Sequence, residues 1–259
     1  MAKIWDCCIF FNELDMLETR FHILDPVVDH FLVCEAPITH AGQPKSMIFH
    51  DHADRFRPWW DKIVYVDSGP IRLQNSWDRE REHRRRISYG LTLAAQPDDW
   101  VIVGDVDEIP APHAVQELHN VREMDSVQFE LDFYYYDLNH RVRQGWAIGA
   151  RRWMEGLHDP NDIRTCKGRR SLTAYSAGWH FSYFNGPEAI IAKVDAFMHH
   201  ADPIIRDLPR DAAFIASKIA ASQDLYGRDL QIDEVLLEDT LPAYILDHPD
   251  HYRALGWIR

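Results

Sequence analysis

Three acidic residues follow an apolar run near the middle of the chain. The run 101–103 leads through Gly104 into Asp105, Asp107 and Glu108. Asp105 and Asp107 are two positions apart, so their side chains point the same way in an extended chain. Carboxylates that close together repel each other unless a cation lies between them. Hard oxygen ligands suit Mg²⁺ or Mn²⁺, which leave coordination positions for substrate phosphates, so the pattern predicts a metal site at Asp105 and Asp107.

The alternative is a solvated acidic turn, which would be the better interpretation of an isolated Asp-x-Asp. The apolar strand before the acids and the third acid after them favour the metal. A two-carboxylate site commonly takes a further ligand from elsewhere, and His180 in the aromatic segment 178–184 is our candidate, with His199 as its competitor. A histidine between aromatic residues is, however, more often a hydrogen-bonded core residue. If His180 is a ligand, activity should fall below about pH 6.5, where imidazole protonates.

A second group of charges lies on one face of a helix that we predict over residues 77–95. Glu80 and Arg84 occupy the face that should be apolar, and they are i, i+4 partners. Charged groups are almost never fully buried unless paired. Pairing toward a crevice would leave Arg84 and Arg79 available for a diphosphate. The alternative is a salt-bridged surface helix, which is our interpretation of the other charges: Arg81, Glu82, Arg85 and Arg86.

These residues need a scaffold, and the first half of the sequence alternates strand and helix patterns. Short apolar runs without strict alternation are typical of strands buried on both faces, and they occur at 4–11, 31–34, 63–66 and 101–103. Asn12 is a predicted N-cap for a helix with one apolar face, carried by Leu14, Leu17, Phe21 and Leu24. Alternating strands and helices predict parallel βαβ units, with a ligand crevice at the carboxyl ends of the strands.

The second half has a different pattern. We predict strands over 126–136, 145–153 and 172–183, and mainly helices from Pro187 onward. No repeat, low-complexity segment or flexible linker separates the halves, so a single α/β domain is expected.

The composition excludes some classes of function. A formal net charge of −13 argues against sequence-independent binding of nucleic acid. No apolar run is long enough to span a membrane, and the N-terminus enters a strand pattern without a signal peptide. Cys7 and Cys8 lie in an apolar run and are expected to be small buried residues. These features predict a cytoplasmic protein with no membrane span; the oligomeric state is left open.

Three segments in order carry a resemblance to a known family. The segments 11–15 (FNELD), 105–110 (DVDEIP) and 178–182 (GWHFS) together resemble glycosyltransferase family 17. The likeness runs from about residue 9 to about residue 250 and passes through Glu35, Lys45, Arg79, Arg84 and Lys193. It implies one GT-A type domain over 1–259, with a Rossmann-like, mostly parallel central sheet flanked by helices.

The resemblance also implies a function. It predicts an inverting, metal-dependent transferase that moves a sugar, N-acetylglucosamine, from a UDP-sugar to a hydroxyl acceptor, with Mn²⁺ or Mg²⁺. Residues 1–110 would bind the nucleotide sugar and residues 111–259 the acceptor. Animal members carry a membrane anchor that we do not find in this sequence. We therefore expect a saccharide, a lipid-linked saccharide or another cytosolic glycoconjugate as the acceptor.

Individual residues receive roles on this basis. Asn12, Glu13 and Glu35 are predicted to contact uracil and ribose, while Asp105 and Asp107 hold the metal directly or through water and ribose. Three acids remain open as the base that takes the acceptor proton: Glu108, Asp132 and Glu188. Aromatic residues could stack on acceptor sugars, with core packing as their default role: Tyr134, Tyr135, Tyr136, Trp146 and Trp153.

Two other functions are compatible with clustered acids. A metal-dependent phosphodiesterase or nucleotidyltransferase usually holds two metals and needs more carboxylates than one Asp-x-Asp. A non-catalytic saccharide-binding protein on a degenerate transferase fold would not need the acids at all. On the transferase hypothesis, Asp107→Ala should abolish transfer and leave the fold intact, because the motif is expected outside the core.

Overall fold

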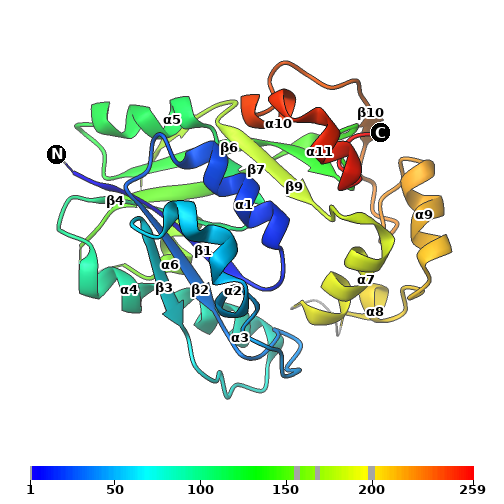
Figure 1. The fold of residues 1–259 in the computed structure, drawn as a ribbon, viewed down its shortest axis with the longest axis horizontal. Coiled ribbons are helices and arrows are strands. Elements are labelled where there is room, and N and C mark those ends of the chain that lie inside the picture. Colours follow the sequence, from blue (N-terminus) through cyan, green and yellow to red (C-terminus); the bar gives the residue numbers. More distant parts are fainter. Residues whose placement is uncertain (1, 155–157, 167–169, 198–201) are drawn as a thin grey trace.

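One mixed sheet organises the molecule (Figure 1). The computed structural model describes residues 2–154, 158–166, 170–197 and 202–259. Within them, ten strands form a sheet whose main path runs β3-β2-β1-β4-β7-β6-β9-β5. The first four are parallel: β3 (Ile63–Asp67), β2 (His30–Glu35), β1 (Ile4–Phe10) and β4 (Trp100–Asp105). The predicted α/β class and its Rossmann-like parallel half are confirmed.

Helices connect and cover the parallel strands. They are α1 (Leu14–Leu24), α2 (Ile48–Asp51), the 3-10 helix η1 (Ala53–Trp59), α3 (Ser76–Arg85) and α4 (Ile87–Ala94). The prediction that Asn12 caps α1 is wrong, because the N-cap residue is Glu13 and it makes no side-chain cap bond. Its carboxylate instead accepts the backbone N–H groups of Phe11 and Asn12.

The single helix predicted over 77–95 is two helices, interrupted at Arg86. Its guanidinium donates to the carbonyl groups of Ser68 and Gly69, beyond the end of β3. The second helix, α4, packs closely on the sheet, since a Cβ added at Gly90 would lie 2.7 Å from the side chain of Leu32.

The second half extends the sheet with antiparallel pairings and with two parallel ones, in which β6 pairs with β8 and β9. The long strand β7 (His140–Arg152) pairs with β4 and with β6 (Ser126–Tyr135). The strand predicted over 172–183 is two strands, β8 (Leu172–Ala174) and β9 (Gly178–Ser182), because the chain bends at Ser176, whose φ is 47°. The unpredicted β5 (Glu108–Pro110) pairs antiparallel with β9, and β10 (Ile232–Glu234) pairs with β7.

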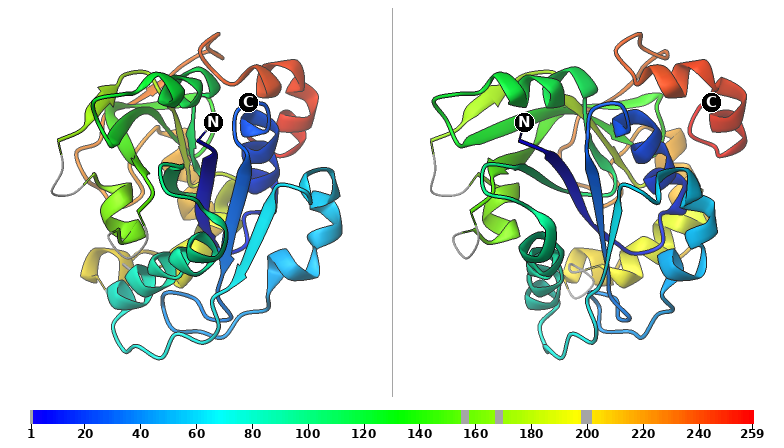
Figure 2. Two further views of the ribbon diagram at one scale, coloured as in Figure 1. Left: turned by 90° about the vertical axis from the view of Figure 1, so that its left-hand side faces the viewer. Right: turned by 60° about the vertical axis from the view of Figure 1, so that its left-hand side comes forward.

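Short helices complete the second half: α5 (Pro112–Gln116), η2 (Glu117–Asn120), α6 (Pro160–Arg164), α7 (Gly186–Ala196), α8 (Pro203–Arg206), α9 (Ala212–Ala220), α10 (Ala243–Asp247) and α11 (Pro249–Ala254). The chain returns at its end to the first half, where α10 and α11 lie beside α1 (Figures 1 and 2). The hydroxyl groups of Thr19 and Tyr252 are 3.0 Å apart at this contact. No helix among the described residues is both long and apolar enough to cross a membrane.

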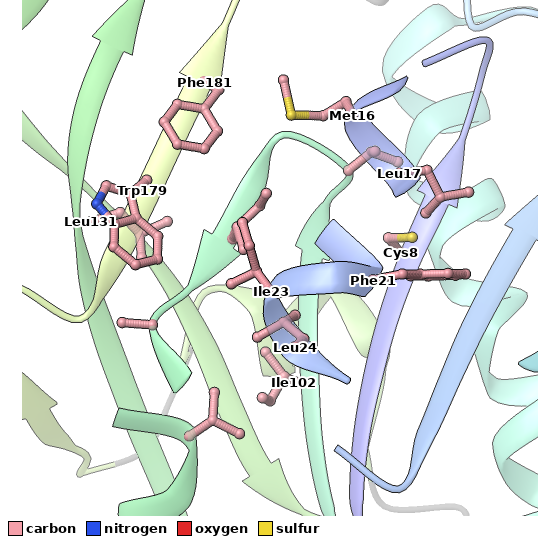
Figure 3. Packing of buried hydrophobic residues seen from close by; sticks show 14 of the residues in the cluster. Cys8, Met16, Leu17, Phe21, Ile23, Leu24, Ile102, Leu131, Trp179 and Phe181 are labelled. Carbon is pink, nitrogen blue, oxygen red and sulfur yellow. The ribbon is translucent and has the colours of Figure 1, made fainter. Parts of the chain in front are cut away.

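The sheet has a hydrophobic core on each face. Cys8 and Ile102 join Phe21 of α1 and Phe181 of β9 on one side (Figure 3). Cys7, the neighbour of Cys8, belongs to the core on the α4 side, since successive strand residues point to opposite faces. All seven residues of β1 are buried, as a strand covered on both faces requires. Cys7 and Cys8 are free and buried, which confirms their predicted role.

Candidate active site

A cleft of about 970 Å³ opens where the parallel strands β1 and β4 end. This is the edge at which α/β sheets commonly bind ligands. Both halves of the chain line it. Its polar and charged lining residues include Glu13, His40, Lys45, Glu80, Arg84, Asp105, Asp107, Glu108, Arg164, His180, Lys193 and Arg228. The predicted crevice is therefore present, and the acids of the strand-end motif lie in its wall.

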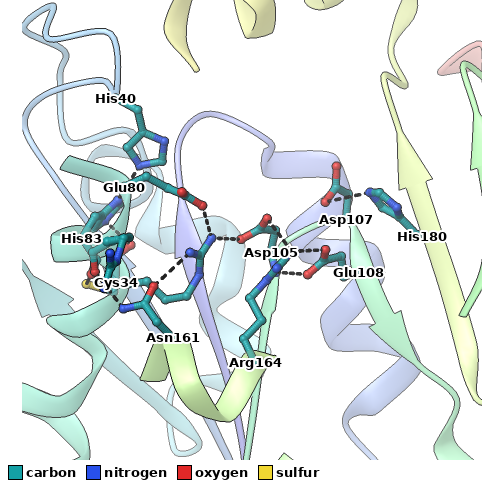
Figure 4. A network of polar contacts seen from close by, with 12 residues as sticks. Cys34, His40, Glu80, His83, Asp105, Asp107, Glu108, Asn161, Arg164 and His180 are labelled. Carbon is teal, nitrogen blue, oxygen red and sulfur yellow. Dashed lines mark hydrogen bonds and ion pairs between the residues drawn. The ribbon is translucent and has the colours of Figure 1, made fainter. Parts of the chain in front are cut away.

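Asp105, the last residue of β4, is held between two arginines (Figure 4). Its Oδ1 lies 2.8 Å from Nη2 of Arg84, and its Oδ2 lies 3.2 Å from Nη2 of Arg164. Burial opposes the charged form of Asp105, but Arg164 and Arg84 together hold its pKa well below the ordinary value. Asp105 is therefore a permanent anion at neutral pH.

Arg84 is paired with Glu80 as the sequence indicated, and it also bonds to Asn161, at 3.3 Å. Its side chain is 5% exposed. Arg84 lines the cleft, and its Nη2 donates to the carboxylates of both Glu80 and Asp105.

Asp107 faces a lysine and a histidine. Its Oδ2 accepts a 2.6 Å hydrogen bond from Nζ of Lys193 in α7, and its Oδ1 lies 3.8 Å from Nε2 of His180 in β9. Burial opposes the charge on Lys193, but Asp107 raises the pKa of this lysine. Asp107 and Glu108 are buried, which corrects the expectation that the motif lies outside the core.

His180 is enclosed by aromatic rings. It stacks on Phe133 with a centroid distance of 4.6 Å and lies 4.8 Å from the ring of Trp146. Burial lowers the pKa of His180 to about 4, although Asp107 acts in the opposite direction. The imidazole thus stays neutral well below pH 6.5, which corrects our expectation of where protonation would remove a ligand.

Glu108 is hydrogen-bonded through both oxygens. Oε2 accepts the backbone N–H of Asp105 at 2.7 Å, and Oε1 accepts from Arg164 and from the indole N–H of Trp146. Burial raises the pKa of Glu108 to about 7; Arg164 lowers it, while Asp105 and Asp107 add to the rise.

The pairing of β5 with β9 brings these groups together. Glu108 stands opposite His180 in the register of the two strands. Close packing is required next to this pair, since Gly178 has φ of 150° and an added Cβ would lie 2.3 Å from the carbonyl oxygen of Ile109. The sequence did not reveal β5, because three residues after a turn carry no strand periodicity of their own.

Two predicted donor-binding residues are used elsewhere. Glu35 is fully buried and does not line the cleft; its carboxylate accepts from Lys45 at 2.8 Å, from Tyr65 at 3.1 Å and from the backbone N–H groups of the α2 turn. Arg79 donates to the carbonyl groups of His40, Leu73 and Gln74. Both residues bond to neighbouring loop segments, and neither of them lines the cleft.

Three further candidates lie outside the cleft lining. Asn12 is exposed, whereas its neighbour Glu13 does line the cleft. Asp132 is paired with Arg141 at 2.8 Å, and Glu188 is exposed in the first turn of α7. His199 lies outside the described residues.

The aromatic candidates divide in the same way. Trp146, 39% exposed, and Tyr135 line the cleft. Tyr134 donates to Glu238 at 2.8 Å, Tyr136 donates to the carbonyl of Gln223, and Trp153 belongs to the core on the α4 side. Core packing was the default for these residues, and it applies to the last three.

Sequence reasoning missed Arg164 and the histidine pair His40 and His83. Arg164 ends the short helix α6, more than fifty positions after its partners Asp105 and Glu108, so no local pattern connects them. Nε2 of His40 lies 3.3 Å from Nδ1 of His83. Burial lowers the pKa of His40 to about 4 and that of His83 well below its ordinary value.

The side chains fit a divalent ion only in part. No group of three or more histidine, cysteine, aspartate or glutamate side chains in the described part of the chain is arranged to hold a metal. Asp107 Oδ1 and His180 Nε2, 3.8 Å apart, do fit, because two atoms bound to one ion at roughly 2.0–2.2 Å lie within about 4.4 Å of each other. Nδ1 of His180 is buried and finds no hydrogen-bond partner among the described residues. A two-residue site of this kind leaves most coordination positions to substrate phosphates.

The comparison with known families decides the class. The pattern of glycosyltransferase family 17 matches residues 1–232. The chain belongs to glycosyltransferase family 17. The three sequence segments predicted this membership.

Individual relatives agree with this. The β-1,4-mannosyl-glycoprotein 4-β-N-acetylglucosaminyltransferases of Homo sapiens and Rattus norvegicus are each 34% identical to the chain over 112 residues. These matches cover 40% of this chain and 21% of each relative. Among solved structures, glucosyl-3-phosphoglycerate synthase of M. tuberculosis aligns over 95% of this chain and 92% of its own, with a TM-score of 0.40 and 13% identity.

Proposed function

We propose that this GT-A type enzyme transfers N-acetylglucosamine from a UDP-sugar to a hydroxyl group of a saccharide or glycoconjugate, with inversion at the anomeric carbon. The observation that carries the proposal is the cleft at the ends of β1 and β4, with Asp105 and Asp107 in its wall. Its volume, about 970 Å³, lies at the upper end of ordinary ligand sites and accommodates a nucleotide sugar together with part of an acceptor. The sugar and the donor nucleotide are suggested by the names of the relatives and by the family resemblance.

The donor nucleotide would lie at the end of the cleft built by the first 110 residues. Glu13, His40 and Trp77 line this end, and Glu13 follows the first strand directly. The diphosphate would lie toward Asp105 and Asp107, where Arg164 and Lys193 also line the cleft. Guanidinium and ammonium groups in a partly buried site stabilise negative charge that develops on a departing diphosphate.

Asp107 and His180 would hold Mn²⁺ or Mg²⁺ at the diphosphate, with Asp105 beside them. The ion would supply Lewis-acid stabilisation of the leaving group. His180 is suited to this position because its pKa, lowered to about 4 by burial, keeps the imidazole neutral and able to ligate. Lys193 neutralises Asp107, and its ammonium group would also lie within reach of the phosphates of a donor bound in the cleft.

Inversion by direct displacement needs a carboxylate that takes the proton of the acceptor hydroxyl. Of the three acids considered, Glu108 borders the cleft, while Asp132 and Glu188 do not. A pKa of about 7 suits proton transfer near neutral pH. Glu108 is therefore our choice of base, and its action requires the hydrogen bond from Trp146 or Arg164 to give way to the acceptor.

The acceptor would bind on the side built by residues 111–259. Trp146 presents a half-exposed indole beside His180 and Glu108, and an indole face suits the apolar face of a sugar ring. Tyr135 and Tyr183 continue the wall beyond it. The site thus places an aromatic surface next to the proposed base.

The products distinguish this function from its alternatives. UDP-N-acetylglucosamine and a panel of UDP-, GDP- and CMP-sugars are first tested by thermal shift with and without Mn²⁺, and the best donor is incubated with saccharide acceptors. Transfer releases UDP and gives a product of inverted anomeric configuration by NMR. Release of UMP and a sugar phosphate would instead identify a phosphodiesterase. Saccharide binding without turnover of any donor would identify a non-catalytic binding protein.

A further inference from the structure

A fully buried arginine lies directly beneath the strand-end acids. Arg20 of α1 has 0% exposure, and it does not line the cleft. Its guanidinium meets the carboxylate of Asp6 in β1 as a two-bond pair, with Nε and Nη2 each 2.7 Å from an oxygen. Asp6 is 1% exposed. A buried charge of this kind must be paired, and the geometry satisfies both partners.

The remaining nitrogen of Arg20 is directed at the acidic segment. Nη1 donates to the backbone carbonyl oxygens of Asp105 at 2.9 Å, Val106 at 3.2 Å and Glu108 at 2.6 Å. The carbonyl of the fourth residue, Asp107, accepts the backbone N–H of Phe181 at 2.8 Å. Every carbonyl from 105 to 108 is thereby held by a donor, three of them by one guanidinium.

This arrangement goes beyond what a stabilising ion pair needs. A buried pair can often be replaced by apolar residues without loss of stability, so stability alone does not explain Arg20. Nη1 of Arg20 bonds to three carbonyl groups of the turn between β4 and β5, and these bonds fix the conformation of the turn. The direction of the backbone in turn sets where the side chains of Asp105 and Asp107 point.

We infer that the Asp6–Arg20 pair is a positioning device for the acids of the cleft. Asp6 orients the guanidinium, the guanidinium holds the 105–108 turn, and the turn aims Asp105 and Asp107 at the ligand. Neither residue touches substrate, so both act through the turn. The inference rests on the proposed function insofar as the ligand is a nucleotide sugar with a divalent ion.

Arg20→Lys is the central test variant. It keeps the charge, but one ammonium cannot form two bonds to Asp6 and also reach three carbonyls. Arg55→Lys is the matched chemical control, because Arg55 pairs with Asp15 and Glu18 around the same helix and makes no contact with the turn. Phe56→Leu, a core change outside the cleft, supplies a variant of lowered Tm.

Two measurements are made on each folded variant. We expect Arg20→Lys to lower kcat for transfer roughly ten- to a hundredfold, the cost of misplaced reacting groups, and to weaken Mn²⁺-dependent UDP binding by calorimetry. Arg55→Lys and Phe56→Leu should keep the kcat of the unsubstituted enzyme. If Arg20→Lys matches Phe56→Leu in kcat and UDP affinity at comparable Tm, the pair is merely structural and the inference fails.

A crystal structure of Arg20→Lys separates this failure from failure of the proposed function. Residues 105–108 should shift relative to residues 100–104 of β4, and this shift can be seen whatever donor the enzyme uses. An unmoved turn would overturn the inference, while absence of UDP binding by the unsubstituted enzyme would overturn only the proposed donor. Should Arg20→Lys not fold, Asp6→Asn carries the same measurements, because it preserves volume and frees the guanidinium from its orienting charge.

Discussion

The carboxylate of Asp107 contacts both a lysine and a histidine, and these two contacts determine which substitution is informative. Lys193 lies 2.6 Å from Oδ2, and Nε2 of His180 lies 3.8 Å from Oδ1. Removing the whole side chain would leave the ammonium of Lys193 without its partner. Asparagine keeps the shape and an acceptor oxygen, so it separates the loss of charge from the loss of packing.

We therefore predict that Asp107→Asn remains folded but loses at least about tenfold in Mn²⁺-dependent UDP affinity, or roughly 1.4 kcal/mol. Calorimetry with UDP, in Mn²⁺ and in EDTA, measures the difference. Asp132→Asn is the control, because Asp132 is also ion-paired but lies outside the cleft lining. Equal affinity of Asp107→Asn and the unsubstituted enzyme in Mn²⁺ would remove the metal-binding role.

Arg84 combines a structural and a ligand-facing position. It lines the cleft and is bonded to Glu80, Asp105 and Asn161. We predict that Arg84→Lys lowers both Tm and UDP affinity, since one ammonium cannot serve two carboxylates and an amide; a loss of roughly 1–3 kcal/mol in unfolding free energy is expected. Thermal unfolding and calorimetry are run beside Arg81→Lys, an exposed arginine of the same helix. A lowered Tm with unchanged UDP affinity would make Arg84 purely structural.

Helix α6 reaches the site because of one glycine. Gly149 of β7 has no side chain, and an added Cβ would lie 1.9 Å from the carbonyl oxygen of Ile163 and 2.8 Å from Sγ of Cys166. This close approach places the next residue, Arg164, against Asp105 and Glu108. The position of this cleft-lining arginine thus depends on backbone contact between a helix and a strand.

Gly149→Ala should consequently displace α6 and with it Arg164. Overpacking of this kind costs typically about 1–3 kcal/mol, which corresponds to a fall in Tm of several degrees for a chain of this size. UDP affinity should fall as well, because the guanidinium leaves Asp105. Gly145→Ala on the same strand is the stability control, since its added Cβ would meet nothing closer than 3.9 Å. Equal Tm for the two variants would contradict the account.

The whole molecule should lose stability in weakly acidic solution. Burial and Arg84 lower the pKa of His40 to about 4, and burial lowers that of His83 well below its ordinary value. Between about pH 6.5 and pH 4, the unfolded chain binds protons on these residues that the folded chain does not bind. Stability therefore rises with pH across this window and falls as the pH drops.

Replacing both histidines with glutamine should flatten this dependence. The slope of unfolding free energy against pH should decrease by up to about 1.4 kcal/mol per pH unit for each histidine. Urea unfolding at several pH values between about 4 and 7 measures it. His50→Gln, at an exposed position, controls for the loss of an imidazole as such. An unchanged slope in the double variant would show that His40 and His83 titrate alike in both states.

The local sequence was sufficient for the parallel half of the fold and for the acids at the end of β4. Buried strands, amphipathic helix faces and the Glu80–Arg84 pair are encoded in neighbours a few positions apart, and local spacing reports such features directly. Family membership could also be predicted, since the three motifs can be recognised in the sequence in their expected order.

Only the tertiary structure decided which polar residues serve the site. Glu35 and Arg79 have side chains suited to a ligand, but in the folded protein they form hydrogen bonds with the backbone of loops. Arg20 and Arg164 reach the acids across 85 and 59 positions of sequence, through helix and sheet packing that no local pattern encodes. The pairing of β5 with β9, which sets Glu108 opposite His180, is likewise a long-range register. Long-range contacts such as these depend on the fold as a whole, so the sequence alone could name the acids and Arg84, but not Arg20 or Arg164.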